Sequence, residues 1–445
     1  MRLAGRKALV VGIGKSGVAA ARLLATHGAF VAVADDKDAG ALADPLRRLQ
    51  DVPHERYLGG LRDEAVRGRD LIVMSPGVPL STAVVAAARA RGVEVIGEIE
   101  LASRFVDEPV LGVTGTNGKS TTTALTAHLL TSAGKKVFAG GNLGEPLSNR
   151  VLQGGKLDAT VCELSSYQLE SIESLRCASA TVLNVTPDHL DRYPSLEAYA
   201  AAKERIFENQ KAGDSAVLNL ADARVAQMRT ASGVCRRTFD PRGRNADAAG
   251  SVRAKGVLTV DGAEYDLRAK TLRGAHNAEN ALAALLLARH LDAPSWALQQ
   301  GLDSYPGLPH RLEPVRTLLG VEWVNDSKAT NVDSVEKSLS AFDQRVVLIM
   351  GGRGKGAPYR PLRALFPGRV GALLTIGEDA PRIAEELGDL APVTSCGDLR
   401  KAVAQAQKLA RAGDTVLLSP ACASYDQFRN FEDRGDQFKA LVRAL

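Results

Sequence analysis

The sequence is poor in several features that mark particular classes of protein. Its five cysteines are widely spaced in 445 residues and form no C-x-x-C pair, which argues against a disulfide framework and a cysteine zinc site. No apolar run approaches the ~20 residues of a membrane span, and the run at 8–11 is too short for a signal peptide. Basic residues form no tail or block suited to nucleic acid. We therefore expect a cytoplasmic protein with free thiols, no membrane partner and no nucleic-acid partner.

The remaining composition is that of a folded protein with more than one domain. Apolar residues make up 45% of the chain and charged residues 24%, which is ordinary for a globular protein. The length exceeds that of a typical domain of ~100 to 200 residues. The 56 basic and 51 acidic residues are spread along the whole chain, which favours local pockets for anionic small molecules over a basic face.

Short β-branched runs alternate with helical segments almost throughout, a pattern typical of parallel sheets covered by helices. The expected strands lie at 7–11, 30–34, 70–74, 93–96, 109–113, near 137, 160 and 181, at 321–324, 345–350, 372–376 and 415–418, with a hairpin at 257–267. The expected helices lie at 17–27, 119–132, 196–209, 276–290, 333–342 and 399–410, with a last one from 433. Residues 305–310, YPGLPH, predict a linker.

These elements predict an α/β fold with three domains in series. The N-terminal domain, 1–97, is expected to be Rossmann-like. The central domain, 98–307, is expected to resemble a P-loop ATPase with a parallel sheet. The C-terminal domain, 308–445, is expected to be Rossmann-like again.

Residues 112–121, GVTGTNGKST, predict a phosphate-binding loop with one unexpected residue. A strand leads into the loop and a helix begins at Lys119, so that loop amides and the helix N-terminus converge on one point. Lys119 would neutralise β- and γ-phosphate oxygens of ATP, and Ser120 would ligate magnesium. The usual G-x-x-x-x-G-K-[ST] pattern has glycine at position 113, where this chain has valine. We interpret the loop as a variant with T-G-T-N-G-K spacing.

A carboxylate and a histidine follow two strands of the central domain. Glu163 ends an apolar strand in VCELSSYQ, and His189 follows another strand in LNVTPDHLD. Parallel strands bring such residues to one edge of the sheet, beside the phosphate loop, and a buried glutamate without a cation is costly. We predict a magnesium site from Ser120, Glu163 and His189, although each residue taken alone fits a turn or helix cap equally well.

The N-terminal strand leads into a second glycine-rich loop, VVGIGKSG, which is a G-x-G-x-x-G with Asp35 and Asp36 at the end of the next strand. This motif alone indicates NAD, but it also fits FAD or a nucleotide sugar. Ser75, in the SPG that follows strand 71–74, faces the same ligand or belongs to a plain Pro-Gly turn. Because no later part of the sequence resembles a hydride-transfer site, a dinucleotide is the second choice of ligand for this loop.

The C-terminal domain carries three polar loops, each after a strand: NDSKATN at 325–331, GGRGKG at 351–356 and SPACAS at 419–424. Two of these loops hold a lysine, Lys328 or Lys355, which suits an anionic substrate such as a carboxylate. Solvated surface lysines are the commoner explanation for either one.

Together these motifs resemble the Mur ligase family, the ATP-dependent amide-bond ligases of peptidoglycan precursor synthesis. The T-G-T-N-G-K-[ST] loop is a hallmark that this family shares with folylpolyglutamate synthase, which accounts for the valine. The strings GIGKSG, ELSSYQLE, NVTPDHLDRY, GLPHR, NDSKATN, GGRGKG and SPACASYDQFRNFEDRG extend the resemblance over essentially the whole chain. They are most similar to the branch that adds D-glutamate to UDP-N-acetylmuramoyl-L-alanine.

The resemblance implies the following sites. The ATP-binding residues would be Gly115, Thr116, Asn117, Gly118, Lys119, Ser120, Thr121, Asn277, Asn280, Arg311 and Asp326. The UDP-substrate would lie on Gly14, Lys15, Ser16, Asp35, Asp36, Ser75, Asn142, Ser165 and His189. D-Glutamate would lie on Lys328, Thr330, Lys355, Ser424 and Phe431. Magnesium would be held by Ser120, Glu163, His189 and Lys203, and catalysis would depend on Lys119, His189, Lys203 and Lys355.

Two of these positions deserve separate comment. Lys203 matches the lysine that Mur ligases carry as a carbamate, a CO2 adduct, whereas the residues alone predict a solvated helix lysine. Arg353 lies where relatives can carry an acidic residue, so its role stays open.

The resemblance further implies a small-molecule enzyme that acts as a monomer. ATP would phosphorylate the L-alanyl carboxylate to an acyl phosphate, and the amine of D-glutamate would displace the phosphate. A sister ligase such as folylpolyglutamate synthase is the alternative enzyme. A nucleotide-binding switch or an NAD-binding protein is the alternative without ligase activity.

Overall fold

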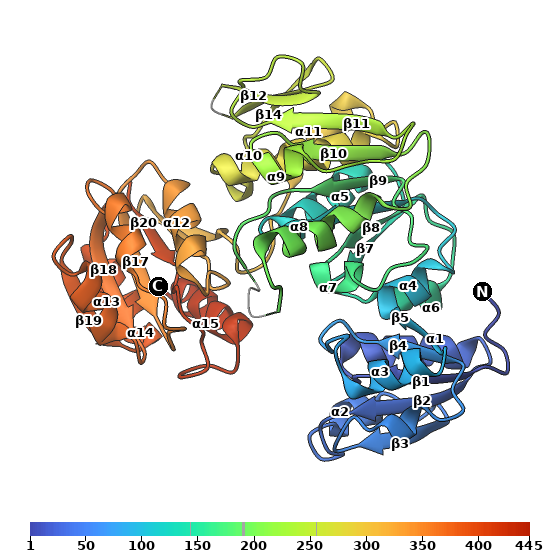
Figure 1. Cartoon of the computed structure of the whole chain (residues 1–445). Helices are drawn as coiled ribbons and strands as arrows, with labels where there is room; N and C mark the ends of the chain where they lie inside the picture. Colours follow the sequence, from blue (N-terminus) through green and yellow to red (C-terminus); the bar gives the residue numbers. More distant parts are fainter. Residues whose placement is uncertain (143, 189–191, 255) are drawn as a thin grey trace. The chain divides into compact units, whose positions relative to one another are not determined.

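A computed structural model describes residues 1–142, 144–188, 192–254 and 256–445. Within these described residues the chain forms three sheets in series, each with helices packed on it (Figure 1). The predicted α/β fold with three domains is thereby confirmed, whereas the limits predicted near 97 and 307 stay predictions. By contacts the chain divides into two compact units. The first unit comprises Met1–Tyr265 and Glu279–Gly301, and the second comprises Asp266–Ala278 and Leu302–Leu445.

The N-terminal sheet has the strand order β3-β2-β1-β4-β5, with every pair of neighbours parallel. Its strands are β1 (Lys7–Val11), β2 (Phe30–Asp35), β3 (His54–Leu58), β4 (Leu71–Met74) and β5 (Glu94–Gly97), and its helices are α1 (Lys15–Thr26), α2 (Ala43–Arg47), α3 (Ala83–Ala90) and α4 (Glu98–Ser103), with a 3-10 turn at Asp63–Val66. Val10, Val33 and Val73 pack toward α1, while Leu9 and Ile72 pack toward α3. Burial on both faces explains why β1 and β4 are continuous apolar runs.

The central sheet has the order β14-β13-β12-β11-β10-β9-β6-β8-β7. Its strands are β6 (Val110–Thr114), β7 (Val137–Gly141), β8 (Ala159–Glu163), β9 (Ser179–Val182), β10 (Ser215–Asn219), β11 (Cys235–Asp240), β12 (Gly250–Ala254), β13 (Val257–Val260) and β14 (Ala263–Asp266). The strands from β7 to β12 are parallel, and β13 turns back antiparallel to β12, so the predicted parallel sheet has an antiparallel extension. The expected hairpin is the neighbouring pair β13 and β14.

The helices that follow the central strands are α5 (Lys119–Ser132), α6 (Leu147–Gln153), α7 (Ser166–Leu169), α8 (Leu196–Glu204), α9 (Ala223–Ala226), α10 (Ala275–Arg289) and α11 (Ser295–Ser304), with 3-10 turns at Arg205–Phe207 and Lys270–Leu272. Helix α5 begins and ends where the sequence predicted, and the boundary between the two units falls within α10.

The C-terminal sheet has the order β15-β16-β20-β17-β18-β19, with only its edge pair β15 and β16 antiparallel among the described pairs. Its strands are β15 (Glu313–Leu318), β16 (Val321–Asn325), β17 (Val346–Gly351), β18 (Val370–Ile376), β19 (Val393–Gly397) and β20 (Thr415–Leu418). Its helices are α12 (Val332–Ser340), a 3-10 helix at Arg360–Leu365, α13 (Ala380–Leu387), α14 (Leu399–Leu409) and α15 (Phe431–Arg443).

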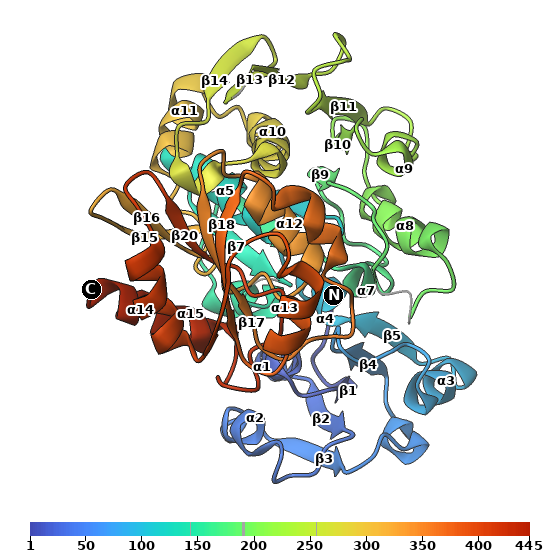
Figure 2. The same cartoon turned by 90° about the vertical axis from the view of Figure 1, so that its left-hand side faces the viewer.

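Helices cover both faces of this sheet. Helices α12 and α13 pack on the face of Leu348 and Leu417, while α14 and α15 lie side by side on the face of Ile349 and Leu418 (Figures 1 and 2). Leu418 pairs with Asn325 on one side and with Ile349 on the other, so the loops after β16, β17 and β20 leave the same edge of the sheet. In the described parts of the chain, no helix has the length and apolarity to cross a membrane.

Candidate active site

The phosphate loop connects β6 to α5 and has two glycines that no other residue could replace without strain. Gly115 has a φ of +150° and Gly118, the N-cap of α5, a φ of +87°. A Cβ on Gly118 would lie 2.3 Å from Asn280 Oδ1. Asn184 fixes the loop from the end of β9, because its side-chain oxygen accepts from the backbone N–H of Asn117 at 2.8 Å and its carbonyl accepts from that of Thr116 at 3.0 Å.

Val113, the residue that departs from the usual loop pattern, is a fully buried member of β6. It pairs in register with Glu163 of β8 and with Thr181 of β9. The position therefore belongs to the sheet and its side chain fills the core, and the loop itself begins only after Thr114.

Two lysines converge on one carbonyl oxygen of this loop. Lys119 Nζ donates to the carbonyl of Gly115 at 2.9 Å and to that of Thr116 at 2.8 Å, and Lys203 Nζ donates to the same Gly115 oxygen at 2.9 Å. Lys203 lies on α8 with only 1% of its surface exposed. The expectation of a solvated helix lysine, drawn from the residues alone, is therefore wrong.

Burial sets the protonation state of Lys203. Desolvation, followed by the charge of Lys119, lowers its pKa from 10.5 to about 6, although Asp188 and Glu163 act in the opposite direction. The ring of Tyr199 also lies 4.4 Å from the nitrogen. An amine with this pKa is mostly neutral at pH 7.

Glu163 offers a carboxylate oxygen that suits a cation. It ends β8 with 2% of its surface exposed, and its Oε1 accepts from Asn142 Nδ2 at 2.7 Å. Its Oε2 is buried without a hydrogen-bond partner among the described residues, an arrangement that is costly unless a cation completes it. Ser120 is also buried, in the first turn of α5. The donor set thus fits magnesium, which prefers oxygen ligands.

Two observations limit the metal assignment. His189, predicted as the third ligand, lies outside the described residues. In 1–142, 144–188, 192–254 and 256–445, no three His, Cys, Asp or Glu side chains are grouped to hold a metal ion.

The N-terminal glycine loop is held by its own backbone and by side chains at the ends of the two neighbouring strands. A Cβ on Gly17 would lie 1.9 Å from the carbonyl oxygen of Gly12, which accepts from Ser75 Oγ at 2.6 Å. Asp35 accepts from the backbone N–H of Ile13 at 2.8 Å. The predicted residues Gly14, Lys15, Ser16, Asp35 and Ser75 thus meet at the ends of β1, β2 and β4.

The other residues predicted for the UDP-substrate have structural partners of their own. Asp36 accepts from the backbone N–H of Leu61 at 3.0 Å. Lys15 pairs with Glu145 at 3.0 Å and donates to the Gly144 carbonyl at 2.6 Å. Ser165 caps α7.

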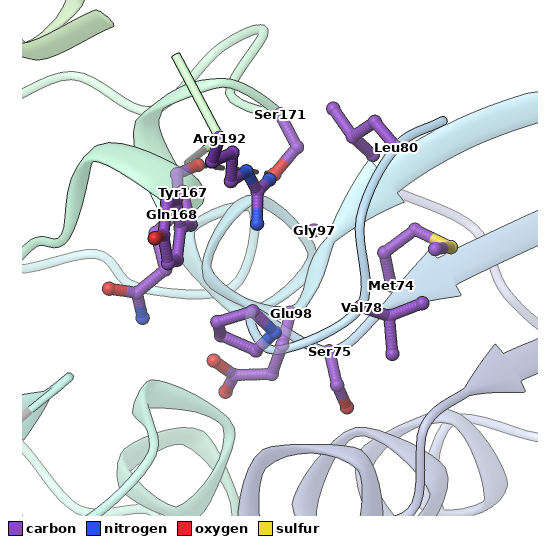
Figure 3. Close-up of a pocket in the computed structure, with 11 residues that line it drawn as sticks. Met74, Ser75, Val78, Leu80, Gly97, Glu98, Tyr167, Gln168, Ser171 and Arg192 are labelled. Carbon is purple, nitrogen blue, oxygen red and sulfur yellow. Dashed lines mark hydrogen bonds between the residues drawn. The ribbon is translucent and has the colours of Figure 1, made fainter. Parts of the chain in front are cut away.

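A small cavity of about 10 Å³, room for about one water molecule, adjoins these residues (Figure 3). Ser75 and Glu98 line it together with Gln168 of α7 and Arg192, whose guanidinium lies 3.8 Å from the ring centre of Tyr167. Glu98 Oε2 and Gln168 Nε2 are buried without hydrogen-bond partners among the described residues. Burial raises the pKa of Glu98. The cavity therefore has room for a water molecule beside two residues that have polar atoms unpaired within the described parts of the chain.

In the second unit, Asp326 is buried at the end of β16. Its carboxylate accepts from Ser338 Oγ at 2.6 Å, from Ser419 Oγ at 2.8 Å and from the backbone N–H of Leu312 at 3.2 Å. Burial nevertheless raises its pKa to about 6, against these hydrogen bonds and the charge of Arg311.

The residues predicted for ATP are divided between the two units. Arg311 and Asp326 lie in the second unit together with Asn277, whose side chain donates to the Arg273 carbonyl at 2.9 Å. Asn280 lies in the first unit, where it accepts from Thr122 at 3.3 Å.

The residues predicted for D-glutamate come together at the edge where the three C-terminal loops leave the sheet. Lys355 donates to Thr330 Oγ1 at 3.2 Å, and the ammonium of Lys328 lies 5.2 Å from the ring centre of Phe431. Ser424 is buried in the third loop. Each of the first two loops thus brings a lysine to this edge, Lys328 beside Phe431 and Lys355 beside Thr330, and ammonium groups suit a carboxylate substrate.

Arg353, whose role the sequence left open, connects two of these loops through its backbone. Its N–H donates to the Ala423 carbonyl at 2.9 Å, and its carbonyl accepts from the Ala423 N–H at 3.0 Å. Its side chain forms a solvent-exposed pair with Glu378 at 2.9 Å.

Comparison with known proteins decides the family. Residues 6–97 match the family described as "Mur ligase MurD-like, N-terminal domain", 113–288 match "Mur ligase middle domain", and 310–422 match "Mur ligase, glutamate ligase domain". The chain is 52% identical to a protein of Myxococcus xanthus over 100% of both chains. It is 54% identical to one of Anaeromyxobacter dehalogenans over 99% of this chain and 98% of that one. Both are named UDP-N-acetylmuramoylalanine--D-glutamate ligase.

The chain belongs to the Mur ligase family.

Solved structures agree on the fold of this Mur ligase. A UDP-N-acetylmuramate-alanine ligase from Thermotoga maritima matches with a TM-score of 0.60 at 19% identity over 99% of both chains. A pseudomurein peptide ligase type C from Methanothermus fervidus matches with a TM-score of 0.59 at 19% identity over 99% of this chain and 100% of that one. Mur ligases are ATP-dependent enzymes that form amide bonds and use Mg2+, so the predicted enzyme class is confirmed.

The sequence missed several residues that shape this ligase site. Asn184 and Tyr199 hold the phosphate loop, since Thr116 Oγ1 lies 3.4 Å from the Tyr199 hydroxyl. Asn184 stands inside the NVTPDH motif, which is a usable signal, whereas Tyr199 carries none. Arg434, in FEDRG, is fully buried among the C-terminal loops, which the sequence did not reveal.

Proposed function

We propose that this Mur ligase adds D-glutamate to UDP-N-acetylmuramoyl-L-alanine and converts ATP to ADP and phosphate. The observation that carries this proposal is the 52% and 54% identity, over essentially the whole chain, to two proteins named for that reaction. The lysines in two loops at the edge of the C-terminal sheet, Lys328 and Lys355, support an acidic amino acid as the second substrate.

The reaction needs an activated carboxylate, because a carboxylate oxygen is a poor leaving group. One oxygen of the L-alanyl carboxylate attacks the γ-phosphorus of ATP, the bond to the β-phosphate oxygen breaks, and ADP leaves an acyl phosphate behind. The D-glutamate amine then attacks the carbonyl carbon and loses a proton, and inorganic phosphate departs from the tetrahedral intermediate. The product is an amide.

Residues of the first unit handle the phosphates. Lys119 exchanges its two carbonyl acceptors for oxygens of the β- and γ-phosphates, and the glycine loop with Thr116, Asn117, Ser120 and Thr121 supplies backbone and hydroxyl donors. Asn280 adjoins the loop. The family resemblance assigns Asn277, Arg311 and Asp326, which belong to the second unit, to ATP binding as well. Ser120, Glu163, His189 and a carbamate on Lys203 would hold Mg2+, which would offset phosphate charge.

The remaining predicted residues bind the two other substrates, the UDP-substrate and D-glutamate. The UDP part lies on Gly14, Lys15, Ser16, Asp35, Asp36 and Ser75, while Asn142, Ser165 and His189 approach the sugar and the L-alanyl group. D-Glutamate lies on Lys328, Thr330, Lys355, Ser424 and Phe431. Lys355 also offsets charge on the transferred phosphate.

The lowered pKa of Lys203 supports the proposed carbamate on this residue. A neutral amine is the form that attacks CO2: a nitrogen–carbon bond forms, one proton leaves and the side chain becomes an anion. The lowered pKa of Lys203 supplies that neutral amine, and the nearby positive charge of Lys119 stabilises the product. Lys203→Ala should abolish turnover, and added acetate or formate should restore part of it. Full activity of the variant without added acid would refute the carbamate.

Product mass after incubation with ATP, UDP-N-acetylmuramoyl-L-alanine and D-glutamate tests the proposed reaction. A product heavier by one glutamate residue, formed together with one equivalent of phosphate, is expected. An amino-acid panel scored by phosphate release tests the sister-ligase alternative, and turnover independent of D-glutamate would contradict the proposal. A nucleotide-binding switch predicts slow hydrolysis that does not change when the UDP-substrate is added.

We further propose that the enzyme works as a monomer in the cytoplasm. The five cysteines are free thiols, four of them buried, which supports a reducing compartment. Light scattering of the purified chain tests the oligomeric state.

A further inference from the structure

Arg434 lies in the first turns of α15 with 0% of its surface exposed. Its guanidinium donates to Ser327 Oγ at 2.9 Å, to the Ser327 carbonyl at 2.8 Å, to the Cys422 carbonyl at 3.2 Å and to the Gly351 carbonyl at 3.5 Å. All of these partners are neutral.

Among the described residues Arg434 makes no direct ion pair, and Asp426 and Asp326 act on it only through their charge. A buried guanidinium of this kind is costly for a helix that only needs to pack on a sheet. Burial lowers the pKa of Arg434 to about 10, so the group is still charged at neutral pH. A well-packed apolar side chain of similar volume would avoid this desolvation cost. The hydrogen bonds that the guanidinium makes must therefore serve a purpose that an apolar residue cannot.

The partners of Arg434 share one property: each belongs to a different loop at the carboxyl edge of the C-terminal sheet. Ser327 follows β16 and directly precedes Lys328. Gly351 ends β17, four residues before Lys355. Cys422 follows β20, two residues before Ser424. One side chain thus reaches every loop assigned to D-glutamate.

We propose that Arg434 is a positioning residue that holds these three loops in the arrangement that binds the amino-acid substrate. The proposal rests on the proposed function, because the substrate is D-glutamate only if that function holds. The planar guanidinium suits this role, since its five donors point in fixed directions toward several carbonyls at once.

Residues around Arg434 also join these loops. Ser327 Oγ donates to the Phe431 carbonyl at 2.8 Å, which ties the first loop to the start of α15. A Cβ on Gly352 would lie 2.3 Å from the Ala423 carbonyl oxygen and 3.3 Å from Arg434 Nη1. The second loop can therefore approach the third loop and the guanidinium only with glycine at this position.

Arg434→Met removes the charge and the donors at similar volume, and Arg434→Lys keeps the charge with three donors. A matched control is Arg316→Met, because Arg316 donates to the Val442 and Arg443 carbonyls at the opposite end of α15. The measurements are KM for D-glutamate, KM for UDP-N-acetylmuramoyl-L-alanine, and hydrogen exchange of the backbone amides in 326–331, 351–356 and 419–424.

Arg434→Met should raise KM for D-glutamate about tenfold or more, because hydrogen bonds to a charged group are lost. KM for the UDP-substrate should stay unchanged, and exchange should rise in the three loops. Arg434→Lys should recover part of both effects, and Arg316→Met should show neither. Should Arg434→Met fail to fold, Arg434→Lys gives the same comparison with the unchanged protein.

Two results distinguish a failure of the proposed function from a failure of the positioning role of Arg434. If the unchanged protein forms no product with D-glutamate, the proposed function fails, and loop exchange still tests the positioning role. If the unchanged protein is active but both KM values rise together, or if the loops exchange as before, Arg434 is a general stabilising residue and the proposal is overturned.

Discussion

Asp326 gives the sharpest test of the electrostatics of the second unit, through the substitution Asp326→Asn. The carboxylate is buried and its pKa is raised from 3.8 to about 6, whereas in the unfolded chain it returns to its ordinary value. The folded state therefore binds more protons than the unfolded state between pH 4 and 6, and stability falls as pH rises through that window. A rise of about two in the pKa of Asp326 corresponds to about 3 kcal/mol in the free energy of unfolding. This stability is present at pH values below about 4 and is fully lost above pH 6.

Asparagine removes this cost while keeping the shape of the side chain. Its Oδ1 can still accept from the Leu312 N–H, and the hydroxyls of Ser338 and Ser419 can rotate to accept from its amide. Asp326→Asn should thus raise the unfolding free energy at pH 7.5 by up to about 3 kcal/mol, and by about 1 kcal/mol at pH 4.5. Ligase activity should fall nonetheless, because the proposed ATP site loses a negative charge.

Tryptophan fluorescence provides the assay. The chain has two tryptophans: Trp323 is buried in the second unit, and Trp296 is already 70% exposed in the first. The red shift during urea unfolding therefore reports mainly on the second unit. The reasoning would be refuted if the variant and the unchanged protein differed in unfolding free energy by the same amount at both pH values. It would also be refuted if the variant were the less stable of the two at pH 7.5.

Three further substitutions test the packing of the site. Gly118→Ala places a Cβ 2.3 Å from Asn280 Oδ1 at a positive φ, so KM for ATP should rise about tenfold and stability should fall by ~1 to 2 kcal/mol in a thermal melt. Ser165→Ala removes the cap of α7, which costs about 1 kcal/mol, and should raise KM for the UDP-substrate. Gly435→Ala places a Cβ 2.1 Å from His310 Nδ1, so stability should fall by ~1 to 3 kcal/mol and KM for D-glutamate should rise.

Two control substitutions separate local strain from function. Gly134→Ala has a similar positive φ with no atom within 4 Å of the added Cβ, so it should lower stability without changing KM for ATP. Ser195→Ala removes the cap of α8 and should leave KM for the UDP-substrate unchanged. Equal kinetic effects from a test variant and its control would assign the change to general destabilisation.

Burial on both faces did not by itself make a strand predictable, since β10 is buried at every residue and was missed. β1, β20 and helix α5 begin and end where expected, because apolar runs bounded by glycine or polar residues have one stable placement. The edge strand β3, with the sequence HERYL, was missed because its half-exposed polar residues carry no apolar pattern. Its pairing with β2 depends on the sheet already being present.

The candidate site also contains residues that the sequence predicted and residues that it missed. Motifs with fixed spacing predicted the phosphate loop and the three C-terminal loops, since a strand end, glycines and a helix start act over a few residues. Lys203 and Arg434 stand in unremarkable helical sequence, and only the fold shows that both are buried. Their protonation and their partners depend on residues far along the chain.

The sequence by itself determined the α/β class, the phosphate loop and the family, because each rests on local patterns or on strings of residues. The tertiary structure decided that Val113 belongs to a strand, that Lys203 is buried with a lowered pKa, and that Arg434 joins three loops. The physical reason is that burial and long-range hydrogen bonding set the charge and position of a side chain, and neither is a property of the neighbouring sequence.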